Sequence, residues 1–323
     1  MIDVPTDEPA ASKRPTRLGR TVGPVVTLVG LGFAVHVLLP QVADLEQGLR
    51  ALRTGRWPFL ALAVIGSTLT YIAGAWMVRA SVDVPPPWGR TTLIQVAAGA
   101  ASTITPAGLG WLVVNQSYLQ KEGVMEATAK AATGLNLLLT VVSHMGLLLV
   151  LLPFLPALNL PIVTPLEWRV FVDVVVVVTV AAGLLVWIPR VRRKTISVLK
   201  PILEAVPGVV RDPKRSALMV VAAAAANAAY GFALFGAVAA FGSAPPPLGV
   251  LVVYLVAATI AAIAPTPGGL GAMEAALVAG LTRLAIPGGQ AVAATLAFRL
   301  ATFWLPLAVG SIVLQRARRR GWI

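Results

Sequence analysis

The chain has 323 residues, of which 57% are hydrophobic and 12% charged, and its formal net charge is +13. Soluble globular proteins carry about 25% charged residues, and an ionised side chain in hydrocarbon costs roughly 2.5–3.5 kcal/mol, so this composition excludes an ordinary soluble protein and favours insertion into a bilayer. The chain has no cysteine and only two histidines, His36 and His144, which lie far apart in the sequence. Disulfides and thiolate or histidine-rich metal sites are therefore excluded, and we expect no metal and no cofactor.

The uninterrupted apolar runs are long enough to cross a membrane, because a transmembrane helix needs about 20 mostly apolar residues. The first run follows a basic tail, residues 1–21, and lacks a convincing small-residue cleavage site. We therefore interpret it as a retained span and not as a signal peptide. The uninterrupted runs are residues 22–39, 57–78, 131–152, 170–188, 217–241 and 292–314.

Two longer apolar stretches are interrupted by proline and glycine. Residues 91–122 are broken at Thr105-Pro106-Ala107-Gly108, and residues 248–284 are broken at Pro265-Thr266-Pro267-Gly268-Gly269. Each stretch is too long for one span and too punctuated for one straight helix. We therefore predict two helices in each stretch, which meet at the turn and form a hairpin inside the membrane.

Basic residues are concentrated in three segments between or beyond the apolar runs, namely residues 1–21, 190–215 and 316–323. This placement follows the positive-inside rule, so we expect these segments and both termini to be cytoplasmic, and it argues against nucleic acid as a partner. The charge-free loops 153–166 and 242–249 suit the outer face, which requires each broken stretch to enter and leave on the same side. Segment 42–56 should then lie outside although it carries three arginines; its amphipathic pattern indicates a helix in the interface.

The predicted fold is all-α, a polytopic transmembrane helical bundle in a multi-pass protein of the cell membrane. It has about six full spans and two Pro/Gly-broken hairpins, with the N and C termini cytoplasmic. The first half is residues 22–189 and contains hairpin 91–122. The second half is residues 216–315 and contains hairpin 248–284.

The two halves share a motif. Residues 105–110 and 266–271 both read TPxGLG, and Ala-Ala-Thr follows at 131–133 and 293–295. Because the first hairpin would enter from the cytoplasm and the second from outside, the halves would form an inverted-topology repeat, which many transporters use for alternating access. The alternative is that TPxGLG is a common helix–turn–helix sequence that arose twice.

The breaks are candidate binding sites because proline and glycine at membrane depth free backbone groups that cannot reach water. Helix starts at Gly108 and Gly269 would direct N–H groups and the positive end of the helix dipole toward an occupant, for which an anionic lipid headgroup is suitable. The alternative is that these glycines only allow close helix packing. The same two interpretations apply to the other residues of the two motifs, Thr105, Pro106, Gly110, Thr266, Pro267, Gly268 and Gly271.

Glu274 is the only acid between Asp212 and the C-terminus, and it lies one turn into the helix after the second motif. Arg299, in an otherwise apolar span, is its natural partner, and charges at such depth are usually paired or functional. We expect the pair to bind substrate. The alternatives are a buried structural ion pair, or Glu274 capping its own helix start. Asn115 is a candidate in the first half, although asparagine in a span more often bonds between helices. We expect no catalytic residues.

The second motif, PTPGGLGAMEAALVAGL, with AATLAFRL after it, resembles the lysylphosphatidylglycerol synthase transmembrane-region family of flippase-like proteins, and so does TPAGLG with YLQKEGV in the first half. The likeness spans roughly residues 20–315. It implies about eight membrane segments that translocate or bind lipids; fused members flip aminoacylated phosphatidylglycerol made by a separate domain. Glu274 and Arg299 match the family pattern. Asn115-Gln116 and Asn136 stand where the family commonly has an arginine and an aspartate–arginine pair, which argues against a cationic or aminoacyl-lipid substrate.

These observations predict a lipid or lipid-linked-substrate flippase without a lysyl-transferase domain. The expected partners are membrane lipids, anionic or polyprenyl-linked, with a membrane-bound lipid-modifying enzyme as a further possible partner. The alternative is a non-transporting protein that presents lipids to a membrane glycosyltransferase or synthase. A membrane-embedded transferase is disfavoured because the sequence offers few acid–base residues, so we do not expect an enzyme.

Overall fold

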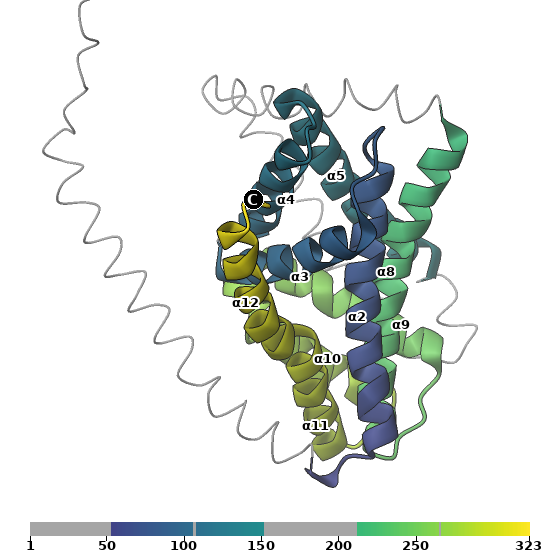
Figure 1. Cartoon of the computed structure of the whole chain (residues 1–323). Coiled ribbons are helices and arrows are strands. Elements are labelled where there is room, and N and C mark those ends of the chain that lie inside the picture. Colours follow the sequence, from purple (N-terminus) through teal and green to yellow (C-terminus); the bar gives the residue numbers. More distant parts are fainter. Residues whose placement is uncertain (1–52, 106–107, 152–211, 265) are drawn as a thin grey trace, which may run out of the picture. The chain divides into compact units, whose positions relative to one another are not determined.

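The computed structural model describes residues 53–105, 108–151, 212–264 and 266–323, and all regular structure in these ranges is helical, as predicted (Figure 1). Most of segment 42–56 and of linker 190–215 lies outside the described residues. The helices are α2 (Trp57–Ala80), α3 (Trp88–Ile104), α4 (Leu109–Lys121), α5 (Glu126–Leu151), α8 (Pro213–Ala240), α9 (Pro247–Ile263), the short 3-10 helix η3 (Pro267–Gly269), α10 (Ala272–Arg283), α11 (Gly288–Arg299), the π-helical turn η4 (Leu300–Trp304) and α12 (Leu305–Arg319).

Four helical segments of the described part are long and apolar enough to cross a membrane. They are α2, α5, α8 and the continuous segment Gly288–Arg319, which contains α11, η4 and α12. They correspond to four of the six predicted spans; predicted spans 22–39 and 170–188 lie outside the described residues. Large apolar side chains on these helices are exposed, among them Ile65, Val142 and Val221. Exposed apolar side chains on long apolar helices suit contact with lipid, and a soluble protein rarely exposes so many of them.

Helices α2 and α8 lie side by side and run antiparallel (Figure 1). At one end the N–H of Arg56 donates to the Ala240 carbonyl at 2.9 Å, and at the other Arg215 Nε donates to the Ala80 carbonyl at 2.5 Å. The backbones approach closely between these ends, because a Cβ built on Gly66 would lie 2.8 Å from the Ala229 oxygen. Small residues permit such contact between membrane helices. We call the two ends the Arg56 end and the Ala80 end.

The first broken stretch begins and finishes at the Ala80 end. Helices α3 and α4 pack against each other, with the predicted break between them. The Arg79 guanidinium, in the last turn of α2, lies 4.5 Å from the ring centroid of Trp88, the first residue of α3. Arg90 near the start of α3 and Glu122 just after α4 form an ion pair of 2.6 Å. The ion pair therefore holds the two outer ends of the stretch together.

The second broken stretch begins and finishes at the Arg56 end. Helix α9 starts at Pro247, soon after α8 ends, and packs against α10 beyond the break. The hydroxyl of Ser243, just before α9, donates to Gln290 Oε1 at 2.5 Å, at the start of the helix that follows α10. The two broken stretches therefore begin at opposite ends of the α2–α8 pair.

The long helical segment that follows each broken stretch packs against the first helix of the other broken stretch. In α12 a Cβ on Gly310 would lie 2.4 Å from the Val96 oxygen of α3. In α5 the His144 ring contacts the Leu255 carbonyl of α9 at 3.1 Å. The second break also lies against the first half, because η3 contacts α3. The two halves consequently interlock.

Candidate functional site

The second break is a turn whose backbone requires glycine. Gly269 has φ +65 and lies so close to α9 that an added Cβ would be 2.5 Å from the Cβ of Ala261. Gly271 has φ +82, a left-handed conformation that side-chain-bearing residues rarely adopt, and it precedes the first residue of α10. The Thr266 hydroxyl donates to the Leu270 carbonyl at 3.0 Å and closes the turn. Pro267 is the first residue of η3.

Glu274 caps the helix that starts at this turn. Its Oε2 accepts the N–H of Gly271 at 2.6 Å, and its side chain is in the first turn of α10. A carboxylate at this position satisfies an N–H that has no partner within the helix and interacts favourably with the helix dipole. The cap leaves the second carboxylate oxygen, Oε1, for another donor.

That donor is Arg299, as the sequence predicted. Its Nε donates to Glu274 Oε1 at 2.5 Å, and its Nη2 is 3.4 Å from the Gly268 carbonyl. The guanidinium also lies 4.2 Å from the ring centroid of Phe303, which the π-helical turn η4 places beside it. From the sequence, the ion pair and the helix cap were two separate alternatives to substrate binding. The structure contains the ion pair and the cap together, because the two carboxylate oxygens of Glu274 have different partners.

The pair is unequally buried. The Arg299 side chain is 9% exposed and that of Glu274 is 21% exposed. Removing one partner of a buried ion pair costs about 3–5 kcal/mol because it leaves an uncompensated charge. Arg299 therefore has to keep an anion beside it, and the more accessible Glu274 side is where another anion can approach. The substrate-binding role of these residues stays a prediction.

The first break has the same need for an N–H cap and meets it without a charge. The Thr105 hydroxyl donates to the Ala101 carbonyl at 2.9 Å and accepts the N–H of Gly110 at 2.7 Å. A Cβ on Gly110 would lie 2.2 Å from the Ala101 oxygen, so glycine lets the start of α4 rest on the end of α3. Gly108, with φ +69, precedes α4. Pro106 lies outside the described residues.

Asn115 is fully buried and its amide is used between helices. Its Oδ1 accepts from Gln95 Nε2 at 2.7 Å, and its Nδ2 donates to the Trp111 carbonyl at 2.9 Å. Gln95 Oε1 accepts in turn from Trp111 Nε1 at 3.2 Å. This network joins α3 to α4, which favours the interpretation that Asn115 bonds between helices over the interpretation that it binds substrate.

Sequence analysis missed a polar cluster around His144. The ring Nδ1 lies 2.8 Å from Asn227 Oδ1, and Nε2 lies 3.1 Å from both the Leu255 carbonyl and the Thr259 hydroxyl. These groups come from α5, α8 and α9. The sequence did offer one sign of this cluster, because His144 is an ionisable residue inside an apolar run. Its partners are 83 and 115 residues away in the sequence, and the sequence offers no way to pair them.

Aromatic rings extend from this cluster toward Arg299. The Tyr254 ring centroid is 6.4 Å from that of His144, 5.2 Å from the stacked Tyr230 and 6.2 Å from Phe298, the residue before Arg299. Stacked and edge-to-face rings at these distances pack favourably. Tyr230 and Tyr254 therefore make packing contacts between helices.

The chain matches a known protein family. The family model described as "Lysylphosphatidylglycerol synthase TM region" matches residues 25–310, which is most of the chain and includes both breaks, Glu274 and Arg299. A search of curated proteins found no match.

Proposed function

We propose that this chain, which belongs to the lysylphosphatidylglycerol synthase transmembrane-region family, is a multi-pass protein of the cell membrane that moves a lipid or lipid-linked substrate between leaflets. In this proposal it is not an enzyme and has no lysyl-transferase activity of its own. Its substrates are anionic or polyprenyl-linked membrane lipids.

The observation that carries the proposal is the relation between the two broken stretches. They begin at opposite ends of the antiparallel α2–α8 pair, held there by the Arg90–Glu122 and Ser243–Gln290 contacts. Equivalent elements of an inverted repeat have this relation, and transporters with such repeats bind substrate at broken helices near the middle of the membrane. With the basic segments in the cytoplasm, this arrangement supports six full spans, two membrane hairpins and two cytoplasmic termini.

The proposed substrate site is the Glu274–Arg299 pair. A guanidinium binds phosphate through parallel hydrogen bonds, and the first turn of α10 adds the positive end of the helix dipole. An anionic headgroup that arrives from the exposed Glu274 side would share or replace the Nε–Oε1 bond of 2.5 Å. Thr266, Gly268 and Gly269 shape the turn beneath it. The first break would supply the opposite wall through Thr105 and Gly110.

Reconstitution into liposomes tests this proposal. The liposomes contain fluorescent phosphatidylglycerol or a labelled polyprenyl phosphate, and the fraction of label that reaches a membrane-impermeant quencher is followed over time. We expect faster scrambling than in empty liposomes and a loss of at least tenfold in Glu274→Gln and Arg299→Leu. Glu126→Gln is the matched control because Glu126 pairs with Lys130 on an exposed helix face. Scrambling equal to that of empty liposomes with every lipid would refute transport by the chain alone.

The same preparation addresses the alternative function. If the chain binds lipid without scrambling it, and a stoichiometric glycosyltransferase or synthase purifies with it, the protein presents lipids to that enzyme. If the two variants scramble as fast as the unmodified protein, the substrate site lies elsewhere.

A further inference from the structure

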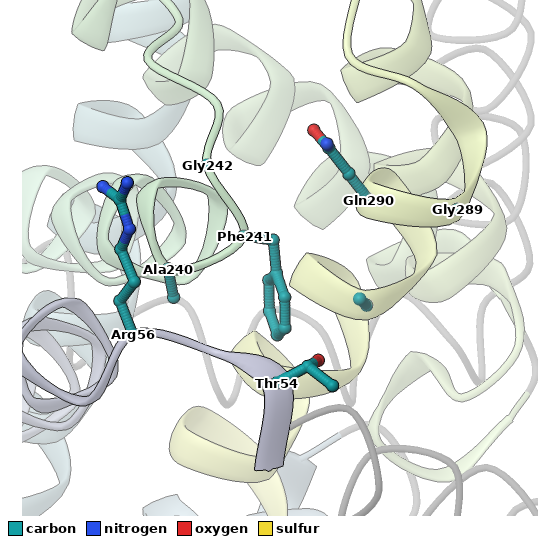
Figure 2. A pocket seen from close by; sticks show the side chains of 8 residues that line it. Thr54, Arg56, Ala240, Phe241, Gly242, Gly289 and Gln290 are labelled. Atoms are coloured by element: carbon teal, nitrogen blue, oxygen red, sulfur yellow. The ribbon is translucent and has the colours of Figure 1, made fainter.

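A pocket of about 420 Å³ lies at the Arg56 end, away from the ion pair. Figure 2 shows its side chains coming from the segment before α2, the end of α8 and the start of α11. Its wall is Thr54, Arg56, Ala240, Phe241, Gly242, Gly289, Gln290 and Ala293.

The wall contains side chains that can donate hydrogen bonds, and no acidic residue belongs to it. Arg56 supplies a guanidinium. The Ser243 hydroxyl donates to Gln290 Oε1 at 2.5 Å, which orients the carboxamide so that its NH₂ group is available as a donor. The Ala240 carbonyl, at the end of α8, already accepts the N–H of Arg56 at 2.9 Å. Arg56 and Gln290 therefore give this wall two side-chain donors.

The start of α11 adds backbone donors to the same pocket. Pro287 precedes the helix and gives no side-chain cap, and the first backbone bond runs from the Ala291 N–H to the Pro287 carbonyl at 2.9 Å. The N–H groups of Gly289 and Gln290 therefore have no acceptor within the helix. These N–H groups and the Arg56 guanidinium, which line the same pocket, are each of a kind that binds phosphate.

The position of the pocket indicates where such a phosphate would come from. The pocket lies at the starts of α2 and of the Gly288–Arg319 segment and at the end of α8, all candidate spans. Span ends meet the lipid headgroups. Trp57, next to Arg56, is 68% exposed, as tryptophans of the membrane interface are. The Phe241 ring provides an apolar wall beside the polar donors.

We propose that this pocket binds the phosphate of an anionic membrane lipid in the leaflet that faces the Arg56 end. It is a site separate from the Glu274–Arg299 pair, because Arg299 lies ten residues beyond Gly289 in α11, about 15 Å along the helix. The inference goes beyond the proposed function, since lipid is held here whether or not the protein transports it.

Binding to the purified full-length chain in detergent tests the proposal. The probes are dioctanoyl phosphatidylglycerol, dioctanoyl phosphatidylcholine and inorganic phosphate, and lipid-bound protein is counted by native mass spectrometry. We expect phosphatidylglycerol to bind at least fivefold more tightly than the other two probes. Arg56→Gln should weaken its binding at least fivefold. Arg53→Gln should change it less than twofold, because Arg53 is an exposed arginine one turn earlier that does not line the pocket.

A second pair of variants avoids any doubt about folding. A Cβ on Gly289 meets no atom within 4 Å, so Gly289→Asp and Gly289→Ala fit the fold equally well. The aspartate would place a negative charge in the first turn of α11 and repel a phosphate, which lowers phosphatidylglycerol binding at least fivefold, whereas the alanine should change it less than twofold.

Several results would overturn the proposal. If Arg56→Gln and Arg53→Gln weaken phosphatidylglycerol binding equally, the binding would reflect surface charge and not this pocket. Unchanged binding in Gly289→Asp would exclude the start of α11 from the site. Inorganic phosphate binding as tightly as phosphatidylglycerol would assign the pocket to a soluble anion. The Arg56→Gln effect must also persist in a Glu274→Gln background. That requirement distinguishes failure of this site from failure of the proposed transport site.

Discussion

At the first break the N–H of Gly110 is capped by the neutral hydroxyl of Thr105, and at the second the corresponding N–H of Gly271 is capped by the carboxylate of Glu274. The carboxylate in turn holds Arg299. When residues 105–110 are aligned with residues 266–271, Val113 stands at the position of Glu274. Val113 is apolar and 62% exposed. Two turns with the same glycine pattern thus differ in charge, which indicates that the shared motif builds the backbone and that only the second half adds an ion pair.

The largest expected effect concerns the two broken stretches, whose outer ends should lie on opposite sides of the membrane. Each position should be labelled either fully or not at all from outside. The chain has no cysteine, so single cysteines can be labelled with a membrane-impermeant maleimide in intact cells. Val84→Cys and Lys121→Cys, at the outer ends of the first broken stretch, should react only after the cells are opened. Ser243→Cys and Thr282→Cys, at the outer ends of the second, should react from outside. Labelling of all four from one side would contradict the inverted arrangement.

The charged break should be more sensitive to loss of one partner than to loss of both. We expect Arg299→Leu and Glu274→Leu each to lower the free energy of unfolding by about 3–5 kcal/mol, because each leaves a buried charge without its partner. The double variant should be more stable than either single variant. Thermal unfolding in detergent, followed by fluorescence, measures this. Additive losses in the double variant would show that the two side chains do not stabilise each other.

Both breaks should depend on glycine to a similar extent. Gly269→Ala forces a left-handed backbone and a contact with Ala261, and Gly110→Ala drives a methyl group into the Ala101 carbonyl. We expect each to cost about 1–3 kcal/mol. Gly146→Ala is the control, since its Cβ meets no atom within 4 Å in a regular helix, and it should stabilise by about 0.5–1 kcal/mol. A harmless Gly269→Ala would mean that the turn is not held in its present conformation.

The neutral cap should matter least. Thr105→Val keeps the shape of the side chain but removes the acceptor for the Gly110 N–H, so we expect a loss of about 1 kcal/mol. Thr105→Ser should retain most of the stability, because serine keeps the hydroxyl. Scrambling rates should fall less than threefold in Thr105→Val if the first break only forms a wall. A loss as large as that of Glu274→Gln would place a binding role at the first break as well.

The sequence by itself determined the class of the protein and the positions of the breaks. Apolar length and the absence of charge are local properties, so α2, α5, α8 and the last span were found to within a few residues, and proline with glycine marked both turns. The Glu274–Arg299 pair could also be predicted, because the second half offers Arg299 a single acid in its membrane-spanning part.

Only the tertiary structure decided which groups far apart in the sequence meet. The antiparallel contact of α2 with α8, the His144–Asn227–Thr259 cluster and the pocket between Arg56 and Gln290 each join segments separated by more than eighty residues. In a membrane every helix is apolar on its outer face, so hydrophobic periodicity does not reveal which helices pack together. The π-helical turn after Arg299, which contains Phe303 and places its ring beside the guanidinium, was likewise seen only in the tertiary structure.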